Sequence, residues 1–216
     1  MRADGGCRGH KPDPSQRWLT FVRNHAQAIV ACDFLVVVTA RFRVLYVFVL
    51  MELGRRKILH HNVTPTPTAE WTLQQFREAL PGDHPYRFVI HDRDSIFSSE
   101  LDKAVAAMGV RVLRTPVRSP QANAICERLV GTLRRECLDF IIPLGERHLR
   151  QVLRSWVTHY NHARVHMSLG PGVPAPLTPS PPENPHRHRL PTDQMIRSKA
   201  VLGGLHHEYW LEKIAA

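Results

Sequence analysis

Hydrophobic residues are concentrated in two long stretches in the first quarter of the chain. Residues 29–39 (IVACDFLVVVT) and 43–53 (RVLYVFVLMEL) are apolar on both faces and rich in β-branched side chains. This pattern is typical of strands in the centre of a sheet that is covered on both sides. The short connection between them indicates an antiparallel hairpin. Residues 55–63 alternate between apolar and polar positions and predict a third strand with one solvent-facing side.

The chain from there to Gly170 predicts helices interrupted by two further strands. Thr68 is suited to cap an amphipathic helix, and Gly109 is suited to end another. The predicted helices cover residues 68–80, 98–109, 119–140 and 145–164, and the predicted strands cover residues 86–92 and 110–115. This order of elements predicts a mixed α/β fold with a five-stranded sheet flanked by helices.

The two ends of the chain differ from this folded core. Residues 1–16 are rich in Gly, Pro and charged side chains and are predicted to be disordered. Residues 17–170 are predicted to form the core itself. Residues 171–216 are predicted to form a Pro-rich, basic tail, extended through Pro191.

Composition and charge point to a particular class of partner. With 216 residues and 43% hydrophobic side chains, the chain can bury one sizeable core. The net charge of +10, from 29 Lys and Arg against 19 Asp and Glu, favours a polyanionic partner, most simply nucleic acid. Four cysteines without a CxxC pair indicate unpaired thiols in a reducing compartment. No membrane span or secretory signal is recognisable, so we expect a cytoplasmic protein.

Two aspartates follow or interrupt predicted strands. Asp33 lies in the middle of the most hydrophobic strand, where a carboxylate is costly to bury unless it is paired or bound to a cation. An ion pair with Arg41 or Arg43 would explain it equally well. Asp92 lies at the end of a strand, where α/β sheets usually carry their chemistry. Asp94, two residues later, could instead cap the helix that follows.

A glutamate on a predicted helix completes a set of three acids. At about 100° per residue, Glu127 shares a face with Asn123 and Arg134. The opposite, apolar face carries Ile125, Leu129, Leu133 and Phe140. Alone, Glu127 would be read as an ordinary solvated glutamate. Together with Asp33 and Asp92 it could hold two metal ions for phosphoryl transfer, because such ions need carboxylates on a rigid scaffold.

Four segments resemble the catalytic core of the DDE transposases and retroviral-type integrases, especially bacterial insertion-sequence transposases. They are ACDFLVV, HDRDSIF, SPQANAICERLVGTLRRE and YNHARVH, and the resemblance spans about residues 18–174. In the second segment, Asp92 takes the position of the family's second aspartate. Asp94 stands where the family usually has glycine, and an extra carboxylate there could alter metal affinity. The 35 positions from Asp92 to Glu127 are close to the family interval.

The resemblance implies a ribonuclease-H-like fold for residues 17–170, as an integrase catalytic core with a helix after it. It implies that Asp33, Asp92 and Glu127 hold two Mg²⁺ or Mn²⁺ ions and catalyse DNA strand cleavage and strand transfer. A truncated, non-catalytic DNA-binding remnant of a transposable element is the alternative. A nuclease acting on RNA–DNA hybrids is a third reading, which the YNHARVH segment does not support.

The same resemblance implies the partners. DNA would contact Asn123, Arg134 and Arg135, and the chain would act as a homo-oligomer on DNA. Related transposases usually carry helix-turn-helix segments before the core, whereas about thirty residues precede the first strand here. We therefore expect sequence recognition to come from a separate polypeptide or to be missing. The location expected for such a protein is cytoplasmic and DNA-associated, with no membrane contact.

Two other groups of residues have simpler explanations. The histidine pairs at 60–61 and 206–207 are predicted to be surface residues rather than zinc ligands, because no suitably spaced cysteine accompanies them. Trp156 and Tyr160, four residues apart on a helix, are predicted to belong to the core rather than to stack on bases.

Overall fold

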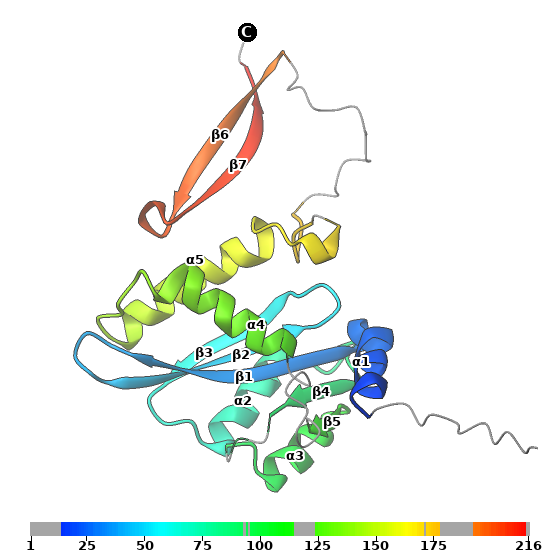
Figure 1. Ribbon diagram of the computed structural model, residues 1–216. Coiled ribbons are helices and arrows are strands. Elements are labelled where there is room, and N and C mark those ends of the chain that lie inside the picture. The colour runs from blue at the N-terminus through cyan, green and yellow to red at the C-terminus, as the bar shows by residue number, and fades with distance from the viewer. Residues whose placement is uncertain are drawn as a thin grey trace, which may run out of the picture.

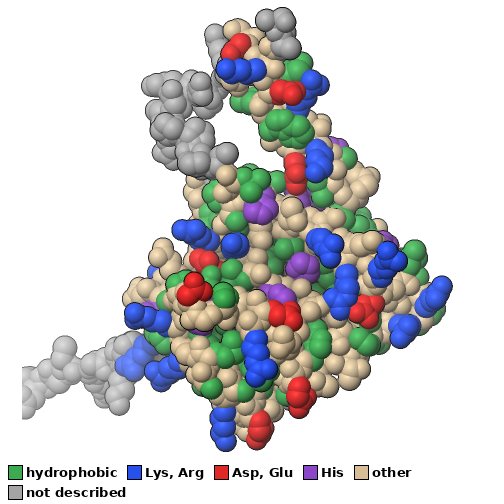
Figure 2. All heavy atoms as spheres, turned by 180° about the vertical axis from the view of Figure 1, so that it is seen from behind, with side chains coloured by type: hydrophobic (Ala, Val, Ile, Leu, Met, Phe, Trp, Pro, Cys, Tyr) green, Lys and Arg blue, Asp and Glu red, His purple; other side chains and the backbone are tan. Residues whose placement is uncertain are grey.

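The computed structural model describes residues 14–92, 94, 96–114, 124–170, 172–177 and 192–214, and its elements are arranged around one central sheet (Figure 1). The strands of that sheet are β1 (Ile29–Val38), β2 (Val44–Glu52), β3 (Ile58–Thr64), β4 (Phe88–His91) and β5 (Arg111–Arg114). The α-helices are α1 (Pro14–His25), α2 (Ala69–Ala79), α3 (Ser99–Ala106), α4 (Ala124–Leu133) and α5 (Glu146–His162). A separate hairpin of β6 (Gln194–Val201) and β7 (His206–Lys213) projects from the body of the protein (Figure 1, Figure 2).

The sheet is mixed, and its strand order is β3-β2-β1-β4-β5. β1, β2 and β3 form an antiparallel meander, with Asp33 opposite Val49. β4 runs parallel to β1 and β5 runs parallel to β4. Along β1, the residues that pair with β4 are Ile29 to Ala31. The chain beyond Asp92 therefore leaves the sheet close to the middle of β1. The predicted five-stranded mixed sheet is confirmed.

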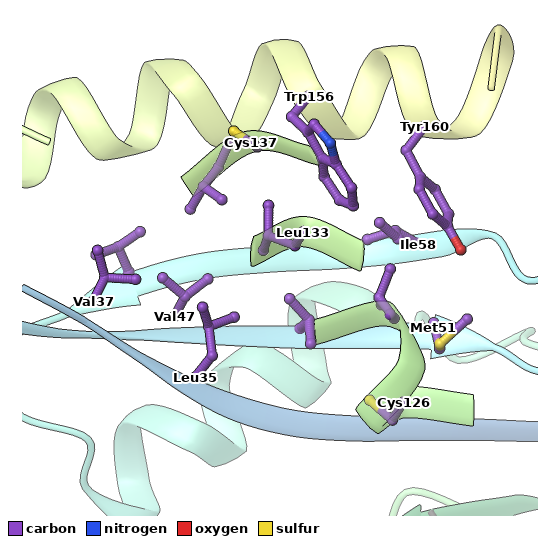
Figure 3. Packing of buried hydrophobic residues seen from close by; sticks show 14 of the residues in the cluster. Leu35, Val37, Val47, Met51, Ile58, Cys126, Leu133, Cys137, Trp156 and Tyr160 are labelled. Atoms are coloured by element: carbon purple, nitrogen blue, oxygen red, sulfur yellow. The ribbon is translucent and has the colours of Figure 1, made fainter. Parts of the chain in front are cut away.

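Helices cover both faces of the sheet because side chains alternate along each strand. Ala31, Leu35 and Val37 of β1 point to the side of α4 and α5, where they join Trp156 and Tyr160 (Figure 3). Val30 and Cys32 point to the other side, towards α2 and α3. The prediction that Trp156 and Tyr160 belong to the core is confirmed, since they are 0% and 3% exposed.

Local sequence signals explain where several helices begin and end. The hydroxyl of Thr68 caps α2 by accepting a hydrogen bond from the Trp71 amide at 3.1 Å. Ser98 caps α3 in the same way, accepting from the Leu101 amide at 3.2 Å. Asp94 therefore does not cap α3, contrary to the alternative considered from the sequence. Gly109 has the positive φ, 90°, that suits a residue following a helix.

The helix predicted over residues 119–140 is shorter than expected. α4 ends at Leu133 and continues as a π-helical turn, η2 (Arg134–Leu138), before the chain turns away. A π turn contains one residue more than an α-helical turn. Within η2, Cys137 is the residue that is buried against the core. Leu129 and Leu133 are buried as predicted, but Phe140 is 67% exposed and does not extend the apolar face.

Two elements were not predicted from the sequence. α1 begins at Pro14, inside the segment expected to be disordered, and Trp18, Phe21 and Val22 pack against the core. The β6–β7 hairpin lies within the predicted tail. Several contacts attach it to the body. His159 Nδ1 lies 3.3 Å from Glu208 Oε1, His206 Nε2 donates to the main-chain oxygen of Glu136 at 2.7 Å, and the rings of His159 and His206 stack.

The histidine pair of β3 is less exposed than the sequence suggested. His60 and His61 are both half-buried, and His60 bonds to Gln75 at 2.9 Å. Among the residues that the structure describes, Cys32, Cys126 and Cys137 are buried and form no disulfide. No described helix is both long enough and apolar enough to cross a membrane.

His61 should make the protein sensitive to acid. Burial, together with the charges of His60, Arg154 and Arg150, lowers its pKa from 6.5 to about 4. The unfolded chain therefore takes up this proton first as the pH falls, and stability that is complete above about pH 6.5 is lost towards pH 4. A displacement of this size corresponds to about 3 kcal/mol, reduced to about 1–2 kcal/mol by the partial exposure of the ring.

We expect His61→Asn to flatten the acid side of the stability profile. The measurement is the free energy of unfolding by denaturant between about pH 4 and pH 7, in the wild type and the variant. The slopes matter rather than the absolute stabilities, since the substitution also changes packing. Parallel profiles would show that His61 does not titrate between the folded and unfolded states.

Candidate active site

Asp33 occupies the inner part of the sheet on the side of α4. It shares this side with Ala31 and Leu35 because strand residues two apart point the same way. Its side chain is half-buried, and Oδ1 accepts a hydrogen bond from the Phe34 amide at 2.8 Å. Within the described part of the chain, neither Arg41 nor Arg43 forms an ion pair with it. The ion pair considered from the sequence is not formed.

The carboxyl of Asp33 lies in a negative environment. Burial, together with the carboxylates of Asp92, Glu127 and Asp94, raises its pKa from 3.8 to about 7, against the opposing effect of the Phe34 amide. A carboxylate in such a place is stabilised by a proton or by a cation.

Asp92 comes directly after β4, the parallel neighbour of β1. Ile90 packs on the α4 side of the sheet and Val89 on the other, so continued alternation brings Asp92 to the side that carries Asp33. Its Oδ1 accepts from the Asp94 amide at 3.0 Å, and Asp94 Oδ1 accepts from the Ile96 amide at 3.1 Å. Asp92 is half-buried whereas Asp94 is exposed.

A buried histidine supports this turn, and the sequence analysis missed it. His91 is 2% exposed, and its ring lies between the main-chain oxygen of Asp92 and a carboxylate oxygen of Asp102, 2.9 Å from the latter. The ring also stacks on Phe97, with 4.3 Å between centroids. His91 therefore ties the end of β4 to α3. The only signal in the sequence was a histidine next to Asp92, which has no meaning without Asp102.

Glu127 lies on the exposed side of α4, in its first turn. Beneath it, Cys126 is fully buried. Burial raises the pKa of the Cys126 thiol well above its usual value, and Asp33, Asp92 and Glu127 add to the effect. Three carboxylates from three elements therefore act on one buried thiol. Asn123, which precedes the helix, lies outside the described residues.

The charged side chains after Glu127 lie on the outer surface. Arg134 is exposed, and its Nη2 donates to the main-chain oxygen of Val36 on β1 at 3.2 Å. Arg135 is also exposed and folds back over Gly131, where a Cβ would come within 3.0 Å of Nη1. Both guanidiniums remain available to phosphates, and their contact with DNA stays a prediction.

The donor set suits a hard divalent cation. In the part of the chain that the structure describes, no three Asp, Glu, His or Cys side chains are arranged as a ready-made metal site. Carboxylates that repel one another are expected to stand apart until a cation draws them together. The raised pKa of Asp33 indicates that the negative potential is uncompensated, which fits a site for Mg²⁺ or Mn²⁺.

The YNHARVH segment, residues 160–166, covers the end of α5 and the residues that follow it, and it connects neighbouring elements. We call this segment the clamp. The side chain of Asn161 pairs with the main chain of Ile58 through two hydrogen bonds of 2.9 Å, so it closes the end of β3 as another strand would. Arg164 donates two hydrogen bonds, of 2.6 and 2.7 Å, to the carboxylate of Glu136. His166 exchanges main-chain hydrogen bonds with Gly172. These contacts hold α4, α5 and the sheet edge together.

Sequence comparison relates part of the chain to a known family. Residues 108–174, which include Glu127 and the clamp, match the family described as "Integrase core domain". This match covers about a third of the chain. No protein with a curated description matches the chain in sequence.

Solved structures share the fold of this chain. One chain of the simian T-cell lymphotropic virus intasome, in complex with PP2A regulatory subunit B56 gamma, has a TM-score of 0.57 at 15% identity, over 85% of this chain and 66% of that one. This chain thus spans slightly less than two thirds of that intasome chain. The Mos1 mariner transposase catalytic domain has a TM-score of 0.56 at 13% identity, over 69% of this chain and 84% of that one.

The HTLV-2 integrase catalytic core domain, in complex with magnesium, has a TM-score of 0.53 at 12% identity, over 68% of this chain and 93% of that one. Together with the family match, these structures confirm the predicted ribonuclease-H-like fold and the resemblance to DDE transposase and integrase cores.

Proposed function

We propose that this integrase core cleaves a DNA strand and transfers a DNA end, with Asp33, Asp92 and Glu127 as its catalytic acids. The observation that supports the proposal is geometric: Asp33 on β1 and Asp92, directly after the parallel neighbour β4, lie on the side of the sheet that α4 covers. The pKa of Asp33, which burial, Asp92 and Glu127 raise, agrees with it. Strand β1, the end of β4 and helix α4 would each supply one acid. Asp94 is exposed and is not part of the proposed set.

Two Mg²⁺ or Mn²⁺ ions are the proposed cofactors. Their support is the oxygen donor set, together with the similar structures: the HTLV-2 core domain contains magnesium, and the Mos1 catalytic domain is known with Mg and with Mn. When bound, such ions make an attacking oxygen more acidic and stabilise the charge on the leaving oxygen.

The side chains of this chain would position the reacting groups. Asp33 and Asp92 come from two parallel neighbouring strands, so their spacing is fixed by the sheet. Glu127 approaches from a helix whose position the clamp determines. Water would attack the phosphorus in the cleavage step, and a 3′-hydroxyl would attack a second phosphodiester in the transfer step. No Ser or Tyr nucleophile is needed, since the protein forms no covalent intermediate with DNA.

The partners follow from charge and from the relatives. Lys and Arg side chains are spread over the face shown in Figure 2, with acidic side chains between them, and the net charge is +10. We propose contacts between DNA and Asn123, Arg134 and Arg135, and a homo-oligomer on DNA, since one relative is an intasome chain. A separate DNA-reading polypeptide and a DNA-associated cytoplasmic location are part of the same proposal.

Strand nicking tests the proposal most directly. Supercoiled plasmid and a duplex with a free 3′ end are incubated with the chain and Mg²⁺, Mn²⁺ or a chelator. We expect nicked circles and joined products only with the metal ions, and none with Asp33→Asn. If the wild type binds DNA but yields neither product with either metal, the chain is a non-catalytic DNA-binding remnant.

A further inference from the structure

A cavity beside α4 is lined by three arginines. Its volume is about 230 Å³. Arg128 comes from α4 and Arg56 from the turn between β2 and β3, while Arg164 and His166 come from the segment after α5. Among the described residues that line the cavity, there is no Asp or Glu.

Two of the three guanidinium charges have no ion-pair partner among the residues that the structure describes. Arg164 is neutralised by Glu136, with Nη2 only 2.6 Å from Oε1. Arg56 and Arg128 form no ion pair with any residue that the structure describes. Arg56 has a positive φ of 60°, which a residue other than glycine adopts at a cost of about 1–2 kcal/mol. Neither arginine therefore serves an evident structural purpose.

The electrostatic effect of these charges converges on His166. Burial, together with the charges of Arg164 and Arg56, lowers the pKa of His166 from 6.5 to about 4, against an opposing effect of Glu136. The ring is thus neutral at physiological pH because it is buried beside two arginines. Tyr160 lines the same cavity, and the same two arginines lower its pKa against the larger, raising effect of burial. The cavity carries a surplus of positive charge.

The size and the donors of the cavity suit a phosphate group. Pockets for whole small molecules usually measure about 300–1,000 Å³, so this one is too small for a complete nucleotide. It could hold several waters, each of which occupies about 30 Å³ in the liquid. Guanidinium groups match the geometry of phosphate oxygens with paired N–H donors. Apolar side chains such as Ile125, Leu129 and Met167 also line the cavity, but its three guanidiniums would repel an ammonium group and favour an anion.

The cavity also has a suitable position for DNA. Arg128 directly follows Glu127, and adjacent residues of a helix point about 100° apart. One turn of α4 thus presents a proposed catalytic acid on one side and the arginine cavity on the next. We infer that the cavity binds a backbone phosphate of the DNA strand whose reacting phosphodiester lies at the acids. This inference rests on the proposed function for its ligand, and it adds Arg56 and Arg128 as the residues that hold the strand.

The salt dependence of DNA binding provides the first test. A plot of log affinity against log salt concentration has a negative slope, and each lost phosphate contact makes it less steep by about 0.9. We expect Arg56→Gln and Arg128→Gln each to make the slope less steep by about that amount, similarly for unrelated DNA sequences. Arg77→Gln on α2 is the matched control, because Arg77 is exposed on a helix that covers the other face of the sheet. It should leave the slope almost unchanged.

Inorganic phosphate provides the second test, since it enters the cavity without the rest of the DNA. We expect phosphate to raise the melting temperature of the wild type and of Arg77→Gln more than chloride does at equal ionic strength. The double variant Arg56→Gln/Arg128→Gln should lose this difference. Circular dichroism of each variant shows that it is folded before either assay is interpreted.

The outcomes separate this inference from the proposed function, because both assays are run in a chelator and need no cleavage. A less steep slope in the cavity variants supports the inference even if the chain never nicks DNA. Equal changes in all three single variants would mean a general charge effect and would overturn it. Stabilisation by phosphate with unchanged DNA slopes would assign the cavity to a free phosphate, which also overturns a DNA contact.

Discussion

Replacing Asp92 by Asn is expected to reduce metal-dependent strand cleavage by about 10³-fold, equivalent to about 4 kcal/mol of activation free energy. The amide cannot supply the negative charge that two cations require, although it preserves the size of the side chain. Glu127→Gln should have an effect of the same order. Both variants should remain folded, since Asp92 is only half-buried and Glu127 is exposed. The measurement is the rate of plasmid nicking with Mg²⁺ at saturating enzyme.

The informative comparison is with Asp94→Asn. Asp94 is two residues from Asp92 and contributes less to the raised pKa of Asp33, as the last of its causes. We expect its replacement to change cleavage by less than about tenfold, or about 1.4 kcal/mol. Glu70→Gln on α2 controls for the loss of one exposed carboxylate elsewhere. If Asp94→Asn is the variant that abolishes cleavage, the second acid has been assigned to the wrong residue.

The fold could be predicted where local sequence and burial agree. β1 and β2 are apolar on both faces because helices cover both sides of the sheet, and that requirement is visible in the sequence. The cap of α2 could be predicted because a threonine bonding three residues ahead is a local event. The end of α4 could not, because a π turn changes the backbone hydrogen bonds without any change in the spacing of apolar residues.

The elements that were missed depend on contacts between distant segments. Trp18, Phe21 and Val22 form the apolar stripe of α1, a helix that begins inside the segment whose composition suggests disorder. The β6–β7 hairpin has largely exposed strands and is attached to the body at His159 and His206. The i, i+3, i+4 spacing of the three α1 residues is visible in the sequence, whereas the attachment of the hairpin through two histidines leaves no periodic pattern.

The candidate site shows the same division. Each acid alone has an ordinary explanation, and only the combination of three elements suggests chemistry. The apolar surroundings of Asp33 were enough to predict that this carboxylate needs a partner or a cation. The support of Asp92 by His91 and Asp102 could not be predicted, because ten residues and a helix turn separate the partners. The same is true of Arg56 and Arg128, which meet only in the folded protein.

Replacing Asp33 by Asn is expected to stabilise the metal-free protein while removing its response to Mg²⁺. The folded pKa of Asp33 is raised from 3.8 to about 7, so the stability it contributes is complete below about pH 4 and lost as the pH rises through 7. At about pH 8 the ionised group therefore carries its full penalty, about 4 kcal/mol without screening and about 2 kcal/mol for a half-exposed side chain. Removing that penalty should raise the melting temperature of the metal-free protein by about 4–8 °C.

Mg²⁺ should stabilise the wild type but not the Asp33→Asn variant. A cation that binds only the folded state adds RT ln(1 + [L]/Kd), or about 1.4 kcal/mol at a concentration ten times Kd. We expect the wild type to gain about 3–5 °C and Asp33→Asn to gain almost nothing. NaCl at equal ionic strength controls for simple screening of the acids, which is non-specific. An equal gain in Asp33→Asn would mean that Mg²⁺ binds away from β1, because a site built on Asp33 cannot keep its affinity when that carboxylate becomes an amide.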